Sequence, residues 1–302
     1  MERGIPTLLM IRPANFGFNS ETAASNHYQQ SSATAAGSVQ ELALKEFDAF
    51  VALLNRFEIP VLVKHDDPSV IRPDAVFPNN WFSAHPQKSM VLYPMEAPSR
   101  RTERRNELII ELCKEFGYTT IHDLTAHEIE GRYLEGTGSI LFDHVYNLAW
   151  ASFSSRTNAD VLFEACEKLG MLPVVFSATD SEGRAIYHTN VIMSLHAKLA
   201  IVCLDAVTDS RDRNMVERVL QKSGRTIVPI SHKQVSAFAG NALFVKNSAG
   251  IDHVVMSATG WRSLSAQQQQ QISAVAIPVT PEISTIEHIG GGSARCMLAE
   301  LF

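Results

Sequence analysis

The stretch SILFDHVYNLAWASFSSRTNADVLFEACEKLGMLPVVFSA, residues 139–178, contains one complete folding unit. It opens with two apolar runs, 139–143 and 145–150, which are separated by a single residue and therefore predict a β-hairpin. Apolar side chains then recur at helical spacing over 159–170, which ends at a glycine, and this predicts an amphipathic helix. The β-branched run 172–178 predicts a third strand. The unit is therefore strand, strand, helix, strand.

The same order recurs about every 55 to 60 residues along the chain. Further helices are predicted over 38–58, 101–117, 212–224 and 263–275, and further strands over 60–64, 89–94, 190–196, 199–205, 226–231, 242–247 and 253–258. Hairpins mixed with helices exclude a plain doubly wound sheet, because each parallel crossover there needs its own helix. No linker rich in Pro, Gly or Ser interrupts the series. We therefore expect a single α/β domain over residues 1–302.

Composition and charge narrow the class of protein. With 45% hydrophobic and 19% charged residues the chain has the composition of a globular protein. Its net charge of -6 gives no basic surface for nucleic acid. No segment approaches the roughly 20 apolar residues that a membrane helix needs, and the first apolar stretch is too short for a secretory signal. We expect a cytoplasmic protein with a small-molecule partner.

The cysteines and histidines argue against metal and disulfide chemistry. Cys113, Cys166, Cys203 and Cys296 are far apart and form no CxxC pair, which argues against zinc clusters and redox dithiols. The histidines show no HxH or HExxH spacing. We therefore predict no metal and no other cofactor. The first three cysteines lie in apparent helices and a strand, where free cysteine packs as a small apolar side chain.

Cys296 differs from the others because it follows three consecutive glycines, Gly290 to Gly292, and a serine. Glycines let the backbone approach a ligand closely and present its N–H groups. A thiol beside such amides, with Arg295 adjacent, lies where the thiolate is favoured, as a cysteine nucleophile requires. The same residues also suit a flexible loop that leads to a last buried cysteine, so the loop alone leaves both interpretations open.

Two titratable residues lie at predicted strand ends. Glu135 precedes a Gly-Thr-Gly turn and a strand, where a carboxylate can bind a cationic ligand or orient a histidine. His188 stands just before Asn190 at the start of another strand, and histidine is the usual acid or base near neutral pH. Taken singly, Glu135 also suits a turn cap and His188 a structural role.

Polar residues suited to hold a substrate gather in two places. Asp74, Asn79 and Asn80 lie in the turn-like segment 73–85, where adjacent amides can bind a planar polar group. Turns rich in asparagine also arise for conformational reasons alone. Arg156 lies just before the helix at 159, where it suits either a surface ion pair or a two-pronged contact to a carboxylate.

Taken in order, these pieces resemble the guanidino-group modifying superfamily of arginine deiminases, dimethylarginine hydrolases and amidinotransferases. The resemblance covers essentially the whole chain and is closest to the arginine-deiminase-related citrulline-utilisation hydrolases. It rests on FPNNW, RRTE at 100–103, EGTG at 135–138, RTN at 156–158, HTN at 188–190 and the glycine-rich loop before Cys296. Each motif is weak alone, but the ordered set is fairly specific. The resemblance implies a pentein fold, a five-bladed α/β propeller of ββαβ modules around a polar channel.

The resemblance also implies a mechanism. Cys296 would attack the central carbon of a guanidino or ureido group and form a covalent adduct. His188 would protonate the departing amine and then activate water, while Glu135 would hold the substrate nitrogens and orient His188. Arg156 and Arg101 would bind the α-carboxylate of an amino-acid substrate. In the same comparison, Ser231, His232 and Asn241 stand where a module can contribute to the channel.

The chain departs from the deiminase pattern at two positions that bear on the substrate. Asn80 stands where deiminases carry an acid, and Asn190 stands in His-Thr-Asn where they carry His-x-Asp. A guanidinium has five N–H donors and no acceptor, so its site benefits from carboxylates. Two amides favour instead a neutral ureido group, as in citrulline, whose carbonyl needs donors. Asp74 and Glu135 still suit a guanidinium, so both substrates stay open.

Three alternatives to a citrulline hydrolase remain at this point. One is an arginine deiminase or dihydrolase, and another is an amidinotransferase, in which an amine resolves the adduct. A third, of another class, is a non-catalytic propeller that only binds an arginine-like ligand or a protein. The presence of Cys296, His188 and Glu135 together argues against the third. The oligomeric state is open, with a homodimer as one alternative.

Overall fold

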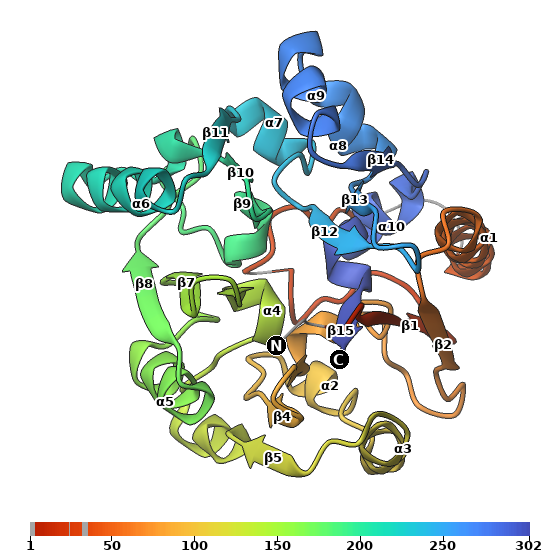
Figure 1. Ribbon diagram of the computed structural model, residues 1–302. Helices are drawn as coiled ribbons and strands as arrows, with labels where there is room; N and C mark the ends of the chain where they lie inside the picture. Colours follow the sequence, from red (N-terminus) through yellow and green to blue (C-terminus); the bar gives the residue numbers. More distant parts are fainter. Residues whose placement is uncertain (1–3, 24, 32–35) are drawn as a thin grey trace.

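Five small three-stranded sheets surround a common centre in the structure, a computed structural model that describes residues 4–23, 25–31 and 36–302. Figure 1 looks down on this arrangement, with the long helices on the outside of the ring. In each sheet the middle strand pairs antiparallel with the inner strand and parallel with the outer strand. This is the five-bladed α/β propeller that the sequence predicts.

The unit predicted over 139–178 forms one blade. Strand β6 (Ile140–Asp143) pairs antiparallel with β7 (Leu148–Ser152), and β7 pairs parallel with β8 (Leu172–Phe176). Helix α5 (Ala159–Leu169) makes the crossover that two parallel strands need. It begins at Asn158, whose side chain accepts hydrogen bonds from two backbone N–H groups of the first turn.

Three further blades repeat this order. They consist of β3 (Phe82–His85), β4 (Ser89–Leu92), α3 (Asn106–Phe116) and β5 (Thr120–Asp123); of β9 (Met193–Leu195), β10 (Leu199–Val202), α6 (Ser210–Lys222) and β11 (Thr226–Pro229); and of β12 (Leu243–Lys246), β13 (Asp252–Val255), α8 (Ala258–Ser263), α9 (Ala266–Ser273) and β14 (Ile277–Val279). The predicted helix at 101–117 is shorter than expected, because α2 (Pro98–Arg101) is a separate turn.

The remaining blade joins distant parts of the chain. Strand β1 (Thr7–Arg12) pairs parallel with β2 (Val61–His65), which follows helix α1 (Ala36–Arg56). The inner strand of this blade is β15 (Ala299–Leu301), which pairs antiparallel with β1. The ring is therefore closed by a pairing between residues at opposite ends of the sequence shown.

Short turns precede the inner strands and meet at the centre of the ring. These central turns are η1 (Pro78–Asn80), α4 (Gly136–Ser139), η3 (Thr189–Val191), η5 (Ala294–Met297) and the residues before β12. Further short helices lie elsewhere in the chain: η2 (Thr125–Glu130), η4 (Leu204–Ala206), α7 (His232–Ser236) and α10 (Ser284–Gly290). Three of these central turns send a side chain to the backbone of the preceding blade. Thr137 Oγ1 donates to the Asn79 carbonyl at 3.2 Å, and Asn190 Nδ2 donates to the Thr137 carbonyl at 3.2 Å. Asn241 Nδ2 likewise donates to the Asn190 carbonyl at 3.1 Å.

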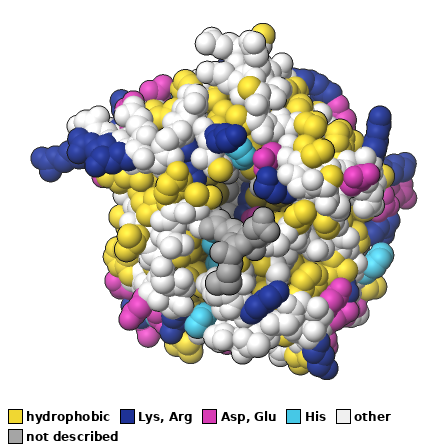
Figure 2. All heavy atoms as spheres, in the orientation of Figure 1, with side chains coloured by type: hydrophobic (Ala, Val, Ile, Leu, Met, Phe, Trp, Pro, Cys, Tyr) yellow, Lys and Arg dark blue, Asp and Glu magenta, His cyan; other side chains and the backbone are white. Residues whose placement is uncertain are grey.

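Burial follows the two faces of each sheet. Apolar side chains fill the space between sheets and outer helices, including Phe47 and Leu54 of α1 and Trp150 of β7. On the face shown in Figure 2, most charged side chains lie towards the rim of the molecule. Cys166 and Cys203 are buried as predicted, whereas Cys113 is partly exposed. Within the residues that the structure describes, no helix is both long and apolar enough to span a bilayer.

We expect Gly240→Ala to loosen the contact between two blades. A Cβ atom at Gly240 would lie 2.2 Å from the Val191 carbonyl oxygen, and backbone cannot move aside as a side chain can. Overpacking of this kind costs about 1–3 kcal/mol, which urea unfolding measures directly. Gly37→Ala in helix α1, where a Cβ meets nothing within 4 Å, is the matched control and should cause no loss. Equal stability of the two variants would contradict the close-contact account.

Candidate active site

A small cavity lies at the turns that meet in the centre of the ring. Its volume is about 20 Å³, and since one water needs about 10–15 Å³, it is closed to anything larger than water. Five of the nine predicted site residues line it: Asp74, Asn80, Arg156, His188 and Cys296. The other lining residues are Thr22, Asn26, Phe77, Arg100, Tyr187, Gly290, Gly291 and Gly292.

Glu135 lies behind His188 rather than in the cavity wall. Its Oε2 is 2.8 Å from His188 Nε2 and 3.3 Å from Arg156 Nη1, and its Oε1 accepts a hydrogen bond from the Glu96 backbone N–H. Burial opposes ionisation of Glu135, but the Arg156 charge and the His188 hydrogen bond outweigh it and hold the pKa well below its usual range. Glu135 is therefore an ionised partner that orients the histidine ring.

Burial is the dominant effect on His188. It lowers the pKa of His188 to about 4, although the hydrogen bond that His188 donates to Glu135 opposes this shift. The imidazole is consequently neutral near pH 7. With Nε2 bonded to Glu135, its Nδ1 is the nitrogen left for other partners, and Nδ1 lies close to Gly138.

Two asparagine amides contact the Cys296 sulfur. Asn241 Nδ2 lies 3.3 Å and Asn190 Nδ2 lies 3.7 Å from Sγ. The orientation of the Asn241 amide is fixed, because its Oδ1 accepts a hydrogen bond from the Arg295 backbone N–H at 3.0 Å. Cys296 is only 5% exposed, and it lines the same cavity as His188 with its sulfur contacted by these two amides.

The three glycines before Cys296 are required by close packing. A Cβ at Gly290 or Gly292 would lie under 3.0 Å from the ring of Phe77. Gly291 has φ near +64° and ends helix α10, and a Cβ there would meet Asn26. The three glycines therefore allow this loop to pack closely between the Phe77 ring and Asn26.

Asn80 has one half of its amide occupied and the other half free. Arg100 Nη1 donates to Asn80 Oδ1 at 2.7 Å, which leaves Nδ2 facing away from the guanidinium. This buried Nδ2 has no hydrogen-bond partner among the described residues. Arg100 is itself held by Glu103 at 2.9 Å and lies 3.8 Å from Asp74. Asn80 therefore offers a donor to whatever occupies the cavity.

Asp74 keeps a free acceptor in the same wall. Its Oδ2 accepts a hydrogen bond from Asn19 Nδ2 at 2.8 Å, whereas its Oδ1 has no partner among the residues that the structure describes. Burial raises the pKa of Asp74, and the nearby Arg100 opposes the shift. An orphaned buried acceptor indicates a place for a ligand's N–H group.

Arg156 is tied to the segment that covers the cavity. Its guanidinium donates to Ser25 Oγ at 2.7 Å and to the Thr22 carbonyl at 3.2 Å, and it stacks over the ring of Tyr187 at 5.0 Å. Glu135 balances its charge from below. Thr22 and Ser25 would have to withdraw before Arg156 could contact a substrate.

Several predicted residues do not line the cavity. Arg101 donates to the Met95 and Glu96 carbonyls outside it, and Arg100 takes the inward place, because neighbours in the short helix α2 point in different directions. Asn79 and Asn190 lie behind the cavity, where they bond the turns together or contact Cys296. Of the three module positions considered above, only Asn241 reaches the site; Ser231 caps helix α7, which His232 begins.

The residues that sequence reasoning missed come from the segment between β1 and α1. Asn19, Thr22, Ser25, Asn26 and Gln29 reach over the cavity to Asp74, Arg156 and the glycine loop. The described residues of this segment, 13–23 and 25–31, form no regular helix or strand. Loops longer than about 12–15 residues are usually functional or disordered, so its length was the available signal.

The fold and this site together define a class. Five ββαβ blades around a channel, with a cysteine, a histidine and a carboxylate at the central turns, make the chain a pentein-fold enzyme of the guanidino-modifying superfamily. Residues 12–302 match the family described as N,N dimethylarginine dimethylhydrolase, eukaryotic, and the chain belongs to that family. It is accordingly a hydrolase that acts on carbon–nitrogen bonds other than peptide bonds.

Solved structures agree on the fold. The chain is similar to ArgZ, an arginine dihydrolase from Cyanobacteria, with 18% identity and a TM-score of 0.76 over 98% of this chain, although it spans only 40% of ArgZ. An ArgZ N-terminal domain variant covalently bound to a reaction intermediate gives 19% identity and a TM-score of 0.76, covering 98% of both chains. A dimethylarginine dimethylaminohydrolase variant, an adduct with S-methyl-L-thiocitrulline, gives 17% identity and a TM-score of 0.66, covering 98% of this chain and 100% of that one. No curated protein matches.

We expect Gly138→Ala to disable the site without unfolding the protein. A Cβ there would lie 2.4 Å from Asn80 Nδ2 and 2.7 Å from His188 Nδ1, so both side chains must move. Because misplacement by about 1 Å can cost about a hundredfold in rate, activity should fall by about that factor. Steady-state kinetics measures the loss, and urea unfolding with Gly37→Ala as control measures stability. Normal activity would show that neither side chain needs its present position.

Proposed function

We propose that the chain hydrolyses the ureido group of a citrulline-like α-amino acid through a covalent adduct on Cys296. The unpartnered Asn80 Nδ2, buried in the wall that also holds His188 and Cys296, carries this choice of substrate. A buried donor without a partner is costly, and it is satisfied by an acceptor. A ureido carbonyl supplies that acceptor, whereas a guanidinium has only donors.

The contacts suggest an order of steps for this reaction. Neutral His188 accepts the thiol proton as Cys296 Sγ bonds to the ureido carbon, and the Asn241 and Asn190 amides support the sulfur. His188 then passes the proton to the departing amine nitrogen as its C–N bond breaks. Water, deprotonated by His188, attacks the adduct and breaks the C–S bond. Glu135 stays ionised throughout and stabilises the imidazolium whenever it forms.

Arg156 is the candidate for the substrate's α-carboxylate. In the closed cavity its donors are used by Ser25 and Thr22, both of which belong to the covering segment. When that segment withdraws to admit a substrate, those donors become free, and a guanidinium binds a carboxylate with two parallel hydrogen bonds. The same movement therefore opens the cavity and releases the group that holds the amino acid.

A guanidino substrate is the second candidate, and one observation favours it. The unpartnered Oδ1 of Asp74 is an acceptor in the same wall, which suits a guanidinium N–H. The family's description names dimethylarginine, and ArgZ is an arginine dihydrolase. Against it, Arg100 and Arg156 already place two cations at the cavity, and both would repel a third. The three carboxylates Asp74, Glu103 and Glu135 outnumber these cations by one, but each of them already lies within 4 Å of one of the two arginines.

Measurement of intact-protein mass and analysis of the products distinguish a ureido substrate from a guanidino substrate. The protein is incubated with citrulline, arginine or dimethylarginine, with Cys296→Ser as the control that removes the nucleophile. We expect an adduct or turnover with citrulline, absent from the control, and ornithine as the amino-acid product. Asn80→Asp, which exchanges the free donor for a carboxylate, should shift preference towards the guanidino compounds by about tenfold or more. Reaction of the unaltered chain with guanidino compounds alone would overturn the ureido proposal.

The low pKa of His188 predicts an unusual pH profile. His188 accepts the thiol proton only when neutral, so kcat/KM should be constant from neutral pH downward and fall as the pH drops through about 4, where the buried imidazole becomes protonated. If His188 were exposed to water, kcat/KM would instead fall near the ordinary histidine pKa of 6.5. Circular dichroism at each pH excludes unfolding as the cause. A fall in kcat/KM near pH 6.5 with an intact fold would contradict the conclusion that burial lowers the pKa of His188.

A further inference from the structure

A second cavity lies on the other side of the central turns. The active-site cavity is lined by residues of the central turns, by residues just before them, and by Thr22, Asn26, Arg100 and Arg156. The second cavity is lined mainly by residues of the inner strands β3, β6, β9, β12 and β15, which follow the turns. Its volume is about 120 Å³, roughly ten times what one water needs and below the approximately 300 Å³ of pockets for drug-sized ligands. A molecule of several heavy atoms fits it.

The two cavities share no lining residue, but they share a turn. Arg295 lines the second cavity, and its neighbour Cys296 lines the first. Both belong to η5, whose position is fixed by the hydrogen bond from the Arg295 backbone N–H to Asn241. The second cavity is therefore separate from the proposed catalytic cavity, although one turn serves both.

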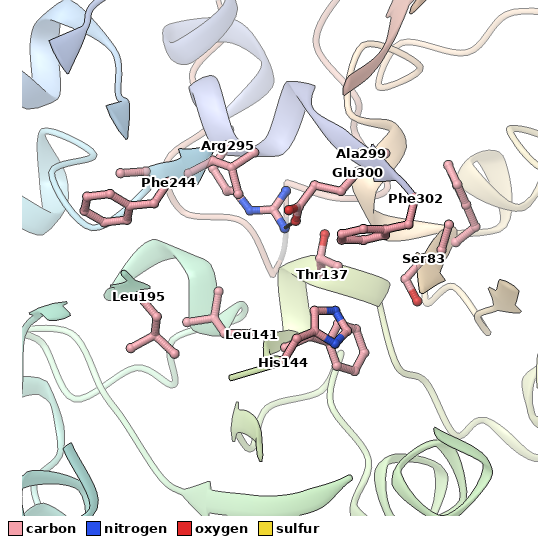
Figure 3. Close-up of a pocket in the computed structure, with 15 residues that line it drawn as sticks. Ser83, Thr137, Leu141, His144, Leu195, Phe244, Arg295, Ala299, Glu300 and Phe302 are labelled. Atoms are coloured by element: carbon pink, nitrogen blue, oxygen red, sulfur yellow. Dashed lines mark hydrogen bonds and ion pairs between the residues drawn. The ribbon is translucent and has the colours of Figure 1, made fainter. Parts of the chain in front are cut away.

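Arg295 and Glu300 bring opposite charges to the second cavity, and they pair loosely. Figure 3 shows the guanidinium and the carboxylate side by side, with Thr137 nearby. Arg295 Nη2 is 3.5 Å from Glu300 Oε2, longer than the roughly 2.7–2.9 Å of a strong charge-assisted hydrogen bond. Arg295 Nη1 donates a shorter hydrogen bond, of 2.7 Å, to the Leu298 carbonyl. Arg295 is only 4% exposed, so a weakly satisfied charge is held out of water.

Elimination by charge narrows the class of ligand. An anion that approaches Arg295 is repelled by Glu300, and a cation that approaches Glu300 is repelled by Arg295. A neutral polar molecule can form hydrogen bonds to both groups, but it brings no charge to compensate either of them. A molecule that carries a carboxylate and an ammonium group on one carbon atom compensates both charges at once. The apolar part of the lining, with Leu141, Leu195 and Phe244, suits a short apolar side chain.

We propose that this second cavity binds a small zwitterionic α-amino acid, with its carboxylate on Arg295 and its ammonium group on Glu300. The ligand's side chain lies towards Leu195 and Phe244. The proposal goes beyond the hydrolase activity and does not rest on the choice between ureido and guanidino substrates, because none of these residues lines the cavity of Cys296.

Equilibrium dialysis with radiolabelled L-alanine tests the site on the full chain. We expect saturable binding that weakens by about tenfold or more in Glu300→Gln, which keeps the shape and removes the charge, and in Leu195→Trp, which fills the cavity. Acetate carries only the carboxylate of L-alanine, and methylammonium carries only its ammonium group. Each should bind more weakly than L-alanine, by about tenfold or more. Glu182→Gln, on an exposed loop, is the matched control for loss of a glutamate charge.

A further variant tests whether L-alanine binds in the active-site cavity instead. Asp74→Asn alters the catalytic cavity and should leave L-alanine binding unchanged. The absence of saturable binding would overturn the proposal. So would binding that Asp74→Asn abolishes and Glu300→Gln spares, or acetate binding with the same affinity as L-alanine. If Leu195→Trp does not fold, as circular dichroism would show, Glu300→Gln decides alone.

Discussion

Backbone carbonyl groups buried at the centre of the ring must find hydrogen-bond donors, and most of the site follows from how they do so. Thr137, Asn190 and Asn241 each donate from one blade to the turn of the blade before it. Asn79, Thr137 and Asn190 each stand three residues before an inner strand, and Cys296 stands at the same place before β15. Thr137 and Asn190 use this position to bond a neighbouring carbonyl, whereas the Cys296 thiol faces the cavity.

Charge around the catalytic cavity is arranged in compensated pairs. Arg100 is matched by Glu103 and Asp74, and Arg156 by Glu135. Buried ions of this kind are tolerated only when geometry and hydrogen bonds are good, which ties the charged residues to one arrangement. Within it burial keeps His188 neutral and Arg156 helps to keep Glu135 ionised. The protonation states of Glu135 and His188 are thus set by their surroundings rather than by either residue alone.

The sequence predicts the parts of this molecule that depend on local pattern. The β-branched runs that become β6, β7 and β8, and the helical spacing of α5, are visible without the fold. Strands of three or four residues such as β14 and β15 are too short to show a period, and β1 was seen only as a brief apolar stretch. Glu135, His188 and Cys296 could be singled out as candidates because they sit in recognisable motifs, and the structure brings them together. The contacts of Thr22 and Ser25 with Arg156 join residues more than a hundred positions apart, and no local pattern encodes them.

The pairing of β15 with β1 has a consequence for the order of folding. Thr7 lies opposite Leu301, so this contact carries the largest loop-closure entropy in the ring and is expected to form late. The turn that carries Cys296 immediately precedes β15 and reaches Asn241 and His188 only when that strand is docked. Partly folded chains with four blades in place would therefore hold the histidine and the glutamate but not the thiol. Activity would therefore appear only with ring closure, after the other four blades have formed.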